Sequence, residues 1–150
     1  MAESQHQSQG SSTQLPGNLS ELCQFLGTTI ENVVLPCFFC HKALGYLDKI
    51  IFMHSDLTIY WQNNTAHGTC YACIAICCKI EFVTFFERYA PVAEIEQRFG
   101  CNFVDLPIRC ITCLRPLTRI EKTDIRDNAE HIFIIGGLAR AQCMICRIGF

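Results

Sequence analysis

The sequence predicts an α+β fold of two small, duplicated four-cysteine zinc-binding domains joined by a linker helix. Four Cys-x-x-Cys pairs occur along the chain, and 29 residues separate the two pairs within each half. Adding 73 to the number of each cysteine in the first set gives a cysteine of the second. Each pair brings two sulfurs together, and a tetrahedral zinc ion takes two pairs. The predicted metal ligands are therefore Cys37, Cys40, Cys70 and Cys73 in one domain, and Cys110, Cys113, Cys143 and Cys146 in the other.

The chain length is consistent with two small domains that depend on metal. A length of 150 residues accommodates one ordinary domain or two small ones, and the repeat favours two. A domain of that size buries little core, and in zinc-finger peptides bound zinc contributes roughly 10–16 kcal/mol to folding. We expect a disordered tail over 1–17, an N-terminal zinc domain over 18–80, a helical linker over 81–106 and a C-terminal zinc domain over 107–150.

Local signals place the elements of the first half. A helix is expected to begin at Asn18, a capping residue, and to end at Gly27, with leucines at helical spacing between them. Asn63-Asn64 predicts a turn. The remaining expected elements are a strand over Val33–Leu44, a short helix over Asp48–Ser55 and a strand over Leu57–Trp61.

A long apolar stretch follows the second cysteine pair. The run Cys70–Tyr89 predicts a helix that is apolar on all sides, and such a helix is expected to be buried on several sides, here as a wall between the domains. Further expected features are helical turns from Pro91 to Gly100, a capping box at Thr118–Glu121, a strand over His131–Ile135 and a turn at Gly136-Gly137.

Charge and composition exclude several classes of protein. The formal net charge is −2, and two zinc ions with four thiolates each make it −6, which disfavours non-specific nucleic-acid binding. Neither a signal peptide nor a membrane-spanning stretch is visible, so twelve cysteines indicate metal and free thiols rather than disulfides. The sequence shows no phosphate-binding loop and no group placed to activate a nucleophile, so we expect no enzyme activity.

Other interpretations of the cysteines fit less well. Thioredoxin-type chemistry uses one Cys-x-x-Cys pair, and a cross-braced RING arrangement conflicts with the internal repeat. His41 completes a haem-attachment pattern, but the matching position holds Leu114, so we interpret His41 as exposed beside a ligand. The cysteines outside the two sets are interpreted as small buried or interfacial thiols: Cys23, Cys77, Cys78 and Cys101.

The cysteine frame closely resembles that of the papillomavirus early protein six family. The resemblance covers about residues 18–150 and includes the 36-residue separation between the two modules and the helix before the first. The supporting motifs are Leu19–Cys23, Thr28–Ile30, Ile108–Cys113 and the Glu121-Lys122 pair.

The resemblance implies a non-enzymatic adaptor in the host nucleus and cytoplasm. Family members trap an acidic LxxLL helix of a host protein, such as a HECT-type ubiquitin ligase or a mastermind-like Notch co-activator, in a groove between the zinc domains and the linker helix. Arg109 is the implied rim cation, with a solvated surface charge as the alternative. The implied pocket residues, for which core packing is the alternative, are Phe39, Leu57, Tyr60, Ile74 and Cys77.

Two departures from the family pattern bear on the partners. Gly136–Ala139 stands where many members have an Arg-Gly-Arg-Trp-like stretch, so positive groove contacts are lost. The chain ends Arg147–Phe150 without a Ser/Thr-x-Val/Leu tail, so PDZ binding is not expected, and the pattern is closer to the cutaneous types. Association into a homodimer is a further possibility that the sequence leaves open.

The alternative function is a zinc-dependent transcription regulator that binds nucleic acid directly.

Overall fold

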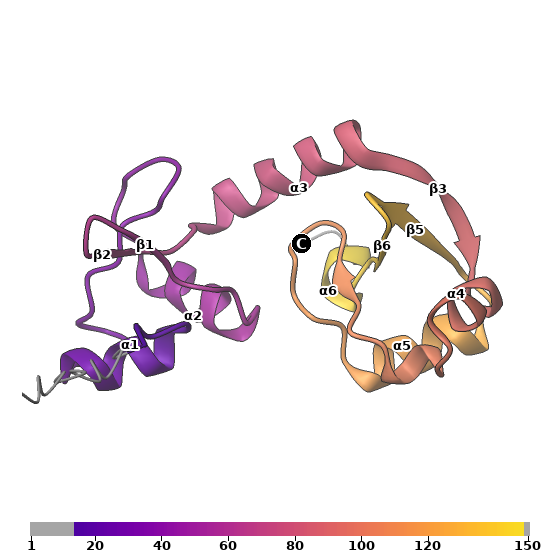
Figure 1. The fold of residues 1–150 in the computed structure, drawn as a ribbon, viewed down its shortest axis with the longest axis horizontal. Helices are drawn as coiled ribbons and strands as arrows, with labels where there is room; N and C mark the ends of the chain where they lie inside the picture. Colours follow the sequence, from indigo (N-terminus) through magenta and orange to yellow (C-terminus); the bar gives the residue numbers. More distant parts are fainter. Residues whose placement is uncertain (1–13, 149–150) are drawn as a thin grey trace, which may run out of the picture.

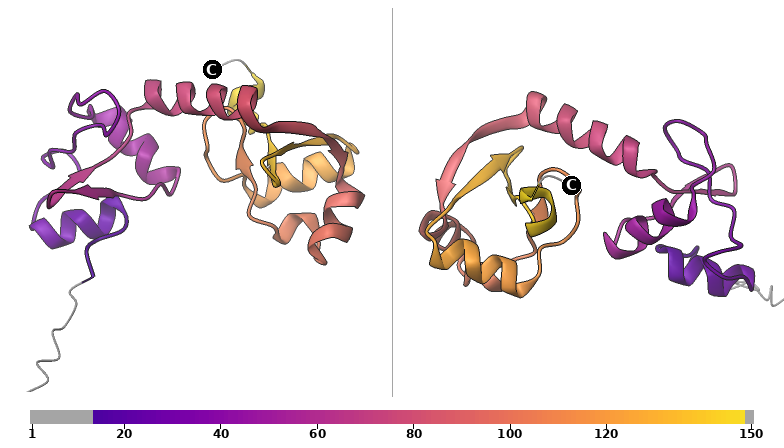
Figure 2. Two further views of the ribbon diagram at one scale, coloured as in Figure 1. Left: turned by 45° about the horizontal axis from the view of Figure 1, so that its top comes forward. Right: turned by 180° about the vertical axis from the view of Figure 1, so that it is seen from behind.

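The computed structural model describes residues 14–148, which form two lobes bridged by one long helix (Figures 1 and 2). Most of the tail predicted at 1–17 lies outside the described residues. Each lobe has its own hydrophobic core, and the two cores share no residue. No helix in the described range is long and apolar enough to cross a membrane.

The N-terminal module packs two helices beside a two-stranded hairpin. The Asn18 side chain accepts a hydrogen bond from the N–H of Glu21, and Gly27 ends the first helix at φ 65°, which confirms both predicted ends. Asn63 and Asn64 form the hairpin turn with φ of 51° and 60°. The elements are α1 (Leu19–Leu26), α2 (Tyr46–His54), β1 (Tyr60–Gln62) and β2 (Thr65–His67).

The C-terminal module contains a four-stranded sheet covered by helices. Its strand order is β3-β5-β6-β4; the first two pairings are antiparallel and β4 pairs with β6 in parallel. The strand predicted at His131–Ile135 and the capping box at Thr118–Glu121 are confirmed. The elements are β3 (Phe86–Pro91), α4 (Val92–Phe99), the 3₁₀ helix η1 (Phe103–Asp105), β4 (Arg109–Cys110), α5 (Arg119–Asp127), β5 (His131–Ile135), β6 (Leu138–Ala141) and α6 (Met144–Arg147).

The duplication reaches further than the cysteines. At the offset of 73 residues α1 matches α4, α2 matches α5, and the β1-β2 hairpin matches β5-β6. The glycines that end α1 and α4, Gly27 and Gly100, both have positive φ, 65° and 68°. Ile95 of α4 is 1% exposed and belongs to the C-terminal core. The expectation that residues 81–106 form a linker is therefore corrected: α4 is the first helix of the second module.

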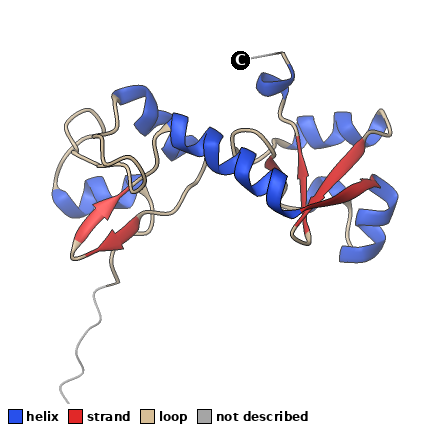
Figure 3. Cartoon of the chain, turned by 90° about the horizontal axis from the view of Figure 1, so that it is seen from above, coloured by secondary structure: helices blue, strands red, loops and turns tan. Residues whose placement is uncertain are grey.

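The chain between the modules is a helix followed by a strand. The helix expected over Cys70–Tyr89 is α3 (Tyr71–Phe85), and the chain then continues as β3, which pairs with β5. Aromatic residues at helical spacing hid this boundary in the sequence. One face of α3 is exposed rather than buried, since Ile76, Ile80 and Val83 are 55%, 59% and 83% accessible. Figure 3 shows α3 running from one module to the other.

Two other sequence expectations change in the first module. The strand expected over Val33–Leu44 is a knuckle with isolated bridges, and the strand expected over Leu57–Trp61 begins later, at Tyr60. Pro16 and Gly17, assigned to the tail, are bonded to the module. The Trp61 side chain donates to the Pro16 carbonyl (2.8 Å), and the N–H of Ile59 donates to the Gly17 carbonyl (2.8 Å).

Candidate zinc centres and an interdomain groove

The first cysteine pair of each module sits in the same tight knuckle. The N–H of His41 donates to the Cys37 carbonyl (2.9 Å), and the N–H of Leu114 donates to the Cys110 carbonyl (3.0 Å). Both residues after the pair have left-handed backbone, with φ of 67° for His41 and 64° for Leu114. His41 is exposed and outside both cysteine groups, in agreement with its interpretation as a non-ligand.

The second cysteine pair of each module opens a helix. Cys70 is the N-cap of α3, and Cys143 is the N-cap of α6. The N–H of Cys70 points at the sulfur of Cys37 (3.5 Å), and the N–H of Cys143 points at the sulfur of Cys110 (3.3 Å). These backbone contacts bring the two pairs of a module together.

Both cysteine quartets fit a tetrahedral zinc ion. Within each quartet all ligand sulfurs lie within 4.8 Å of one another. The Cys40 and Cys70 sulfurs are 3.8 Å apart, and those of Cys113 and Cys143 are 3.9 Å apart. Zinc–thiolate bonds of about 2.3 Å in a tetrahedron require sulfur separations of roughly 3.8 Å. All eight predicted ligands are thus brought together in two four-sulfur sites, and the chain carries two structural zinc sites.

Each quartet also contains one sulfur favoured as a thiolate, the form that binds metal. Burial opposes ionisation of Cys37, but backbone N–H groups of Cys40, Cys70 and Phe39 lower its pKa to about 6. The hydrogen bond from Cys113, with backbone N–H groups, lowers the pKa of Cys110 to about 4. Zinc holds the remaining thiols as thiolates when it binds.

Arg109 joins the two modules. Its guanidinium donates to the carbonyl oxygens of Ser55 (2.5 Å) and Asp56 (3.1 Å) in the first module, and to Leu114 (2.8 Å) in its own. The predicted rim cation is therefore occupied by backbone acceptors at the contact between the modules.

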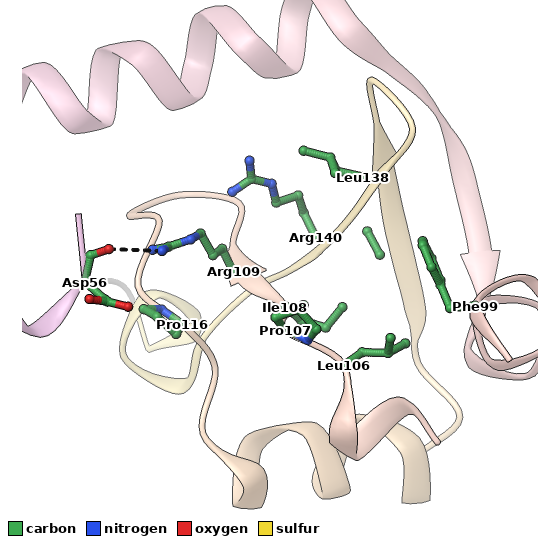
Figure 4. Close-up of a pocket in the computed structure, with 10 residues that line it drawn as sticks. Asp56, Phe99, Leu106, Pro107, Ile108, Arg109, Pro116, Leu138 and Arg140 are labelled. Atoms are coloured by element: carbon green, nitrogen blue, oxygen red, sulfur yellow. Dashed lines mark hydrogen bonds between the residues drawn. The ribbon is translucent and has the colours of Figure 1, made fainter. Parts of the chain in front are cut away.

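A cavity of about 560 Å³ lies where the modules meet (Figure 4). Arg109 and Arg140 extend into its upper part, and apolar side chains form the rest of its wall. Asp56 lies on its first-module side. The apolar lining residues are Phe99, Leu106, Pro107, Ile108, Pro116, Leu138 and Ala139.

Arg140 is a site residue that the sequence did not reveal. It is 9% exposed, and its Nη2 pairs with Glu81 of α3 (3.1 Å), while its buried Nη1 has no hydrogen-bond partner among the described residues. In Figure 4 its side chain points from β6 toward α3. A guanidinium with one unpaired nitrogen bordering an apolar cavity is suited to an anionic group.

A second cavity of about 590 Å³ lies between α2 and the second zinc knuckles. Ile51 and His54 line it from α2, and Tyr71 lines it from the start of α3. Three ligands of the second quartet border it as well: Cys113, Cys143 and Cys146.

The six predicted peptide-binding residues lie in different environments. Arg109 lines the first cavity, and the other five line neither of the two cavities. Ile74 is buried (1% exposed), and Leu57 is partly buried against the N-terminal core. Phe39 and Tyr60 are half exposed and share an aromatic cluster with Phe38. Cys77 is partly buried on α3.

The comparisons with known proteins agree with this architecture. The family model described as Early Protein (E6) matches residues 37–146, from the first ligand to the last. The chain belongs to the E6 family. It is 32% identical over 128 residues to Protein E6 of human papillomavirus type 1, covering 85% of this chain and 91% of that protein.

Two further comparisons also match E6 proteins. Protein E6 of human papillomavirus type 5b is 33% identical over 134 residues, covering 89% of this chain and 85% of that protein. Among solved structures, the C-terminal zinc-binding domain of the HPV51 oncoprotein E6 is 31% identical, with a TM-score of 0.38, over 41% of this chain and 80% of that one. This chain is a viral E6 protein with two zinc-binding cysteine groups.

Proposed function

We propose that this E6 protein is a non-enzymatic adaptor that captures an acidic LxxLL helix of a host protein between its two modules. The observation that carries the proposal is the cavity of about 560 Å³ at the module contact, with apolar walls and two arginines. An amphipathic helix bound in a groove needs apolar contacts for its i, i+3 and i+4 side chains and cations for its acidic flanks. The half-exposed rings of Phe39 and Tyr60 are candidate contacts on the first module.

Arg140 is the better candidate for the acidic contact. Arg109 already donates to three carbonyls, whereas Nη1 of Arg140 has no partner in the described part of the chain. A buried donor without an acceptor raises the free energy of the unliganded protein, and a carboxylate supplies that acceptor. Arg140 follows Gly136–Ala139 directly, so it provides a cation close to where the Arg-Gly-Arg-Trp-like stretch is missing.

The partners we propose are a HECT-type ubiquitin ligase or a mastermind-like transcriptional co-activator, met in the host nucleus or cytoplasm. Capture of the first redirects degradation of host proteins, and capture of the second alters transcription. The two share acidic LxxLL helices, so one groove serves either.

Calorimetric titration of the zinc-loaded chain with one LxxLL peptide from each partner class tests the proposal. We expect micromolar or tighter binding to at least one peptide. Absence of binding to both peptides, in protein shown by metal analysis to hold two zinc ions, contradicts the proposal.

Substitution of Arg140 tests the acidic contact. Arg140→Gln is expected to weaken binding of an acidic peptide roughly tenfold or more, since a charge-assisted hydrogen bond is lost. A peptide with its acidic residues changed to amides is expected to lose a similar amount, with little further loss on Arg140→Gln. Arg119→Gln is the control, because Arg119 is exposed and pairs with Asp105 on α5's side of the module. Unchanged affinity for Arg140→Gln removes Arg140 from the groove.

A further inference from the structure

A carboxylate anchors the second cysteine pair in each module. Asp48 in α2 accepts a hydrogen bond from the N–H of Tyr71, the residue after Cys70 (3.0 Å). Glu121 in α5 accepts one from the N–H of Met144, the residue after Cys143 (2.6 Å). The two carboxylates occupy matching positions at the 73-residue offset. Each links the helix after the first knuckle to the start of the helix carrying the second pair.

The two anchoring carboxylates, Asp48 and Glu121, differ in how many parts of their module they bind. Arg115, two residues after Cys113, donates from Nη2 to both carboxylate oxygens of Glu121 (2.8 and 2.8 Å). Glu121 thus links the two cysteine pairs of its module through one carboxylate. At the matching position of the first module Lys42 is exposed, and within residues 14–148 it makes no hydrogen bond to Asp48.

The carboxylate of the second module is also the more buried of the two. Glu121 is 6% exposed, whereas Asp48 is more accessible. Arg115 and Cys143 border the same cavity, which places a positive charge close to a site that carries −2 when four thiolates bind zinc. Burial of the ligand cysteines does not by itself predict which site holds zinc longer, because three ligands of the second quartet border a cavity. The ranking follows from the hydrogen-bonded network.

We propose that Glu121 and Arg115 are positioning residues for the second zinc site, and that they make this site hold its metal longer than the first. Partners outside the ligand shell fix ligand orientation, and their removal typically weakens metal binding by roughly 10- to 100-fold. The first site, with Asp48 as its anchor, releases zinc first. This inference concerns the metal sites alone and holds whatever peptide the groove takes.

Transfer of zinc from the full-length, two-zinc chain to an excess of a chromophoric chelator tests the ranking. We expect two phases of equal amplitude, a fast phase from the first site and a slow phase from the second. Trp61 is the chain's one tryptophan and lies in the first module, where it donates to Pro16. Its fluorescence change is therefore expected to follow the fast phase.

Matched variants test which carboxylate controls which phase of zinc release. Asp48→Asn is expected to accelerate the fast phase alone, and Glu121→Gln the slow phase alone, by roughly 10- to 100-fold. Arg115→Lys keeps the charge, but lysine is shorter and lacks the planar guanidinium that reaches Glu121, so an intermediate acceleration of the slow phase is expected. Arg115→Lys also serves as the test if Glu121→Gln fails to fold.

Three outcomes overturn the inference. One is a single release phase for both ions in the unmodified chain. Another is a Trp61 signal that follows the slow phase. The third is a slow phase that neither Glu121→Gln nor Arg115→Lys changes.

Discussion

At position 68 the first module has no room for a side chain. A Cβ added to Gly68 would lie 2.7 Å from Cδ2 of Leu35 and 3.2 Å from Cδ2 of Leu44. The matching residue of the second module is Ala141, which is buried and fits its own surroundings. The two modules therefore share a backbone plan but hold residues of different size at this position.

Gly68→Ala is expected to destabilise the first module by about 1–3 kcal/mol, since leucine side chains in a packed core yield poorly to an extra methyl group. Chemical denaturation of the zinc-loaded protein, followed by Trp61 fluorescence, measures the loss. Gly17→Ala is the control, because a Cβ added to Gly17 would lie 3.9 Å from a side-chain oxygen of Glu21, at an ordinary contact distance. Equal stability of the two variants contradicts the expectation.

The sequence predicts the roles of some residues well and those of others poorly. The eight metal ligands follow from spacing, because a ligand set must recur wherever the module recurs. Arg140 and Glu121 look like ordinary surface charges in the sequence, since nothing local indicates that the fold will bury them. The 73-residue offset does pair Asp48 with Glu121, so their shared role was open to detection.

Among the elements, α5 depends on its N-cap residue, Thr118. The Thr118 side chain accepts a hydrogen bond from the N–H of Glu121, and the Glu121 side chain accepts one from the N–H of Thr118. This capping box fixes the start of α5 and the orientation of Glu121 together.

Thr118→Ala is expected to lower the stability of the second module by about 1 kcal/mol through loss of the cap. Thr123→Ala, in the same helix, is the comparison variant, because alanine is well tolerated inside a helix. Hydrogen exchange of the α5 amides in the zinc-loaded chain reads out the second module separately. Equal protection in both variants would show that the cap adds nothing measurable.

The elements with strong end signals were predicted well, and those decided by distant partners were not. α1 and α5 have caps that act within one turn, so their starts follow from local sequence. The end of α3 at Phe85 depends on β5, which offers an edge to the chain from Phe86 onward. An aromatic stretch is compatible with either a helix or a strand, and here the pairing with β5 makes the residues after Phe85 a strand.

In the whole molecule, Arg109 fixes how the modules sit against each other. Loss of its bonds to Ser55 and Asp56 leaves α3 and the Glu81–Arg140 ion pair as the connections described above. Arg109→Ala is therefore expected to increase the radius of gyration of the unliganded, zinc-loaded chain in small-angle X-ray scattering. Arg119→Ala serves as the control, and an identical scattering curve for both variants would contradict this role.

The arrangement of the modules was beyond the reach of the sequence. A resemblance indicated a groove, and a cavity does lie at the module contact, but its walls come largely from the second module. The wall residues converge from several strands and loops, and no periodicity in the sequence encodes such convergence.

All four ligands of the first zinc site precede those of the second in the sequence, and this order has a consequence for synthesis on the ribosome. Cys37 to Cys73 emerge before any cysteine of the second set, and 73 further residues must be added before Cys146 appears. At roughly 5–20 residues per second, the first site is complete about 2–7 s before Cys110 is added and about 4–15 s before the second site is complete. The nascent chain can thus load its first zinc while no thiol of the other quartet is present to compete, which keeps two chemically identical ligand sets from mixing.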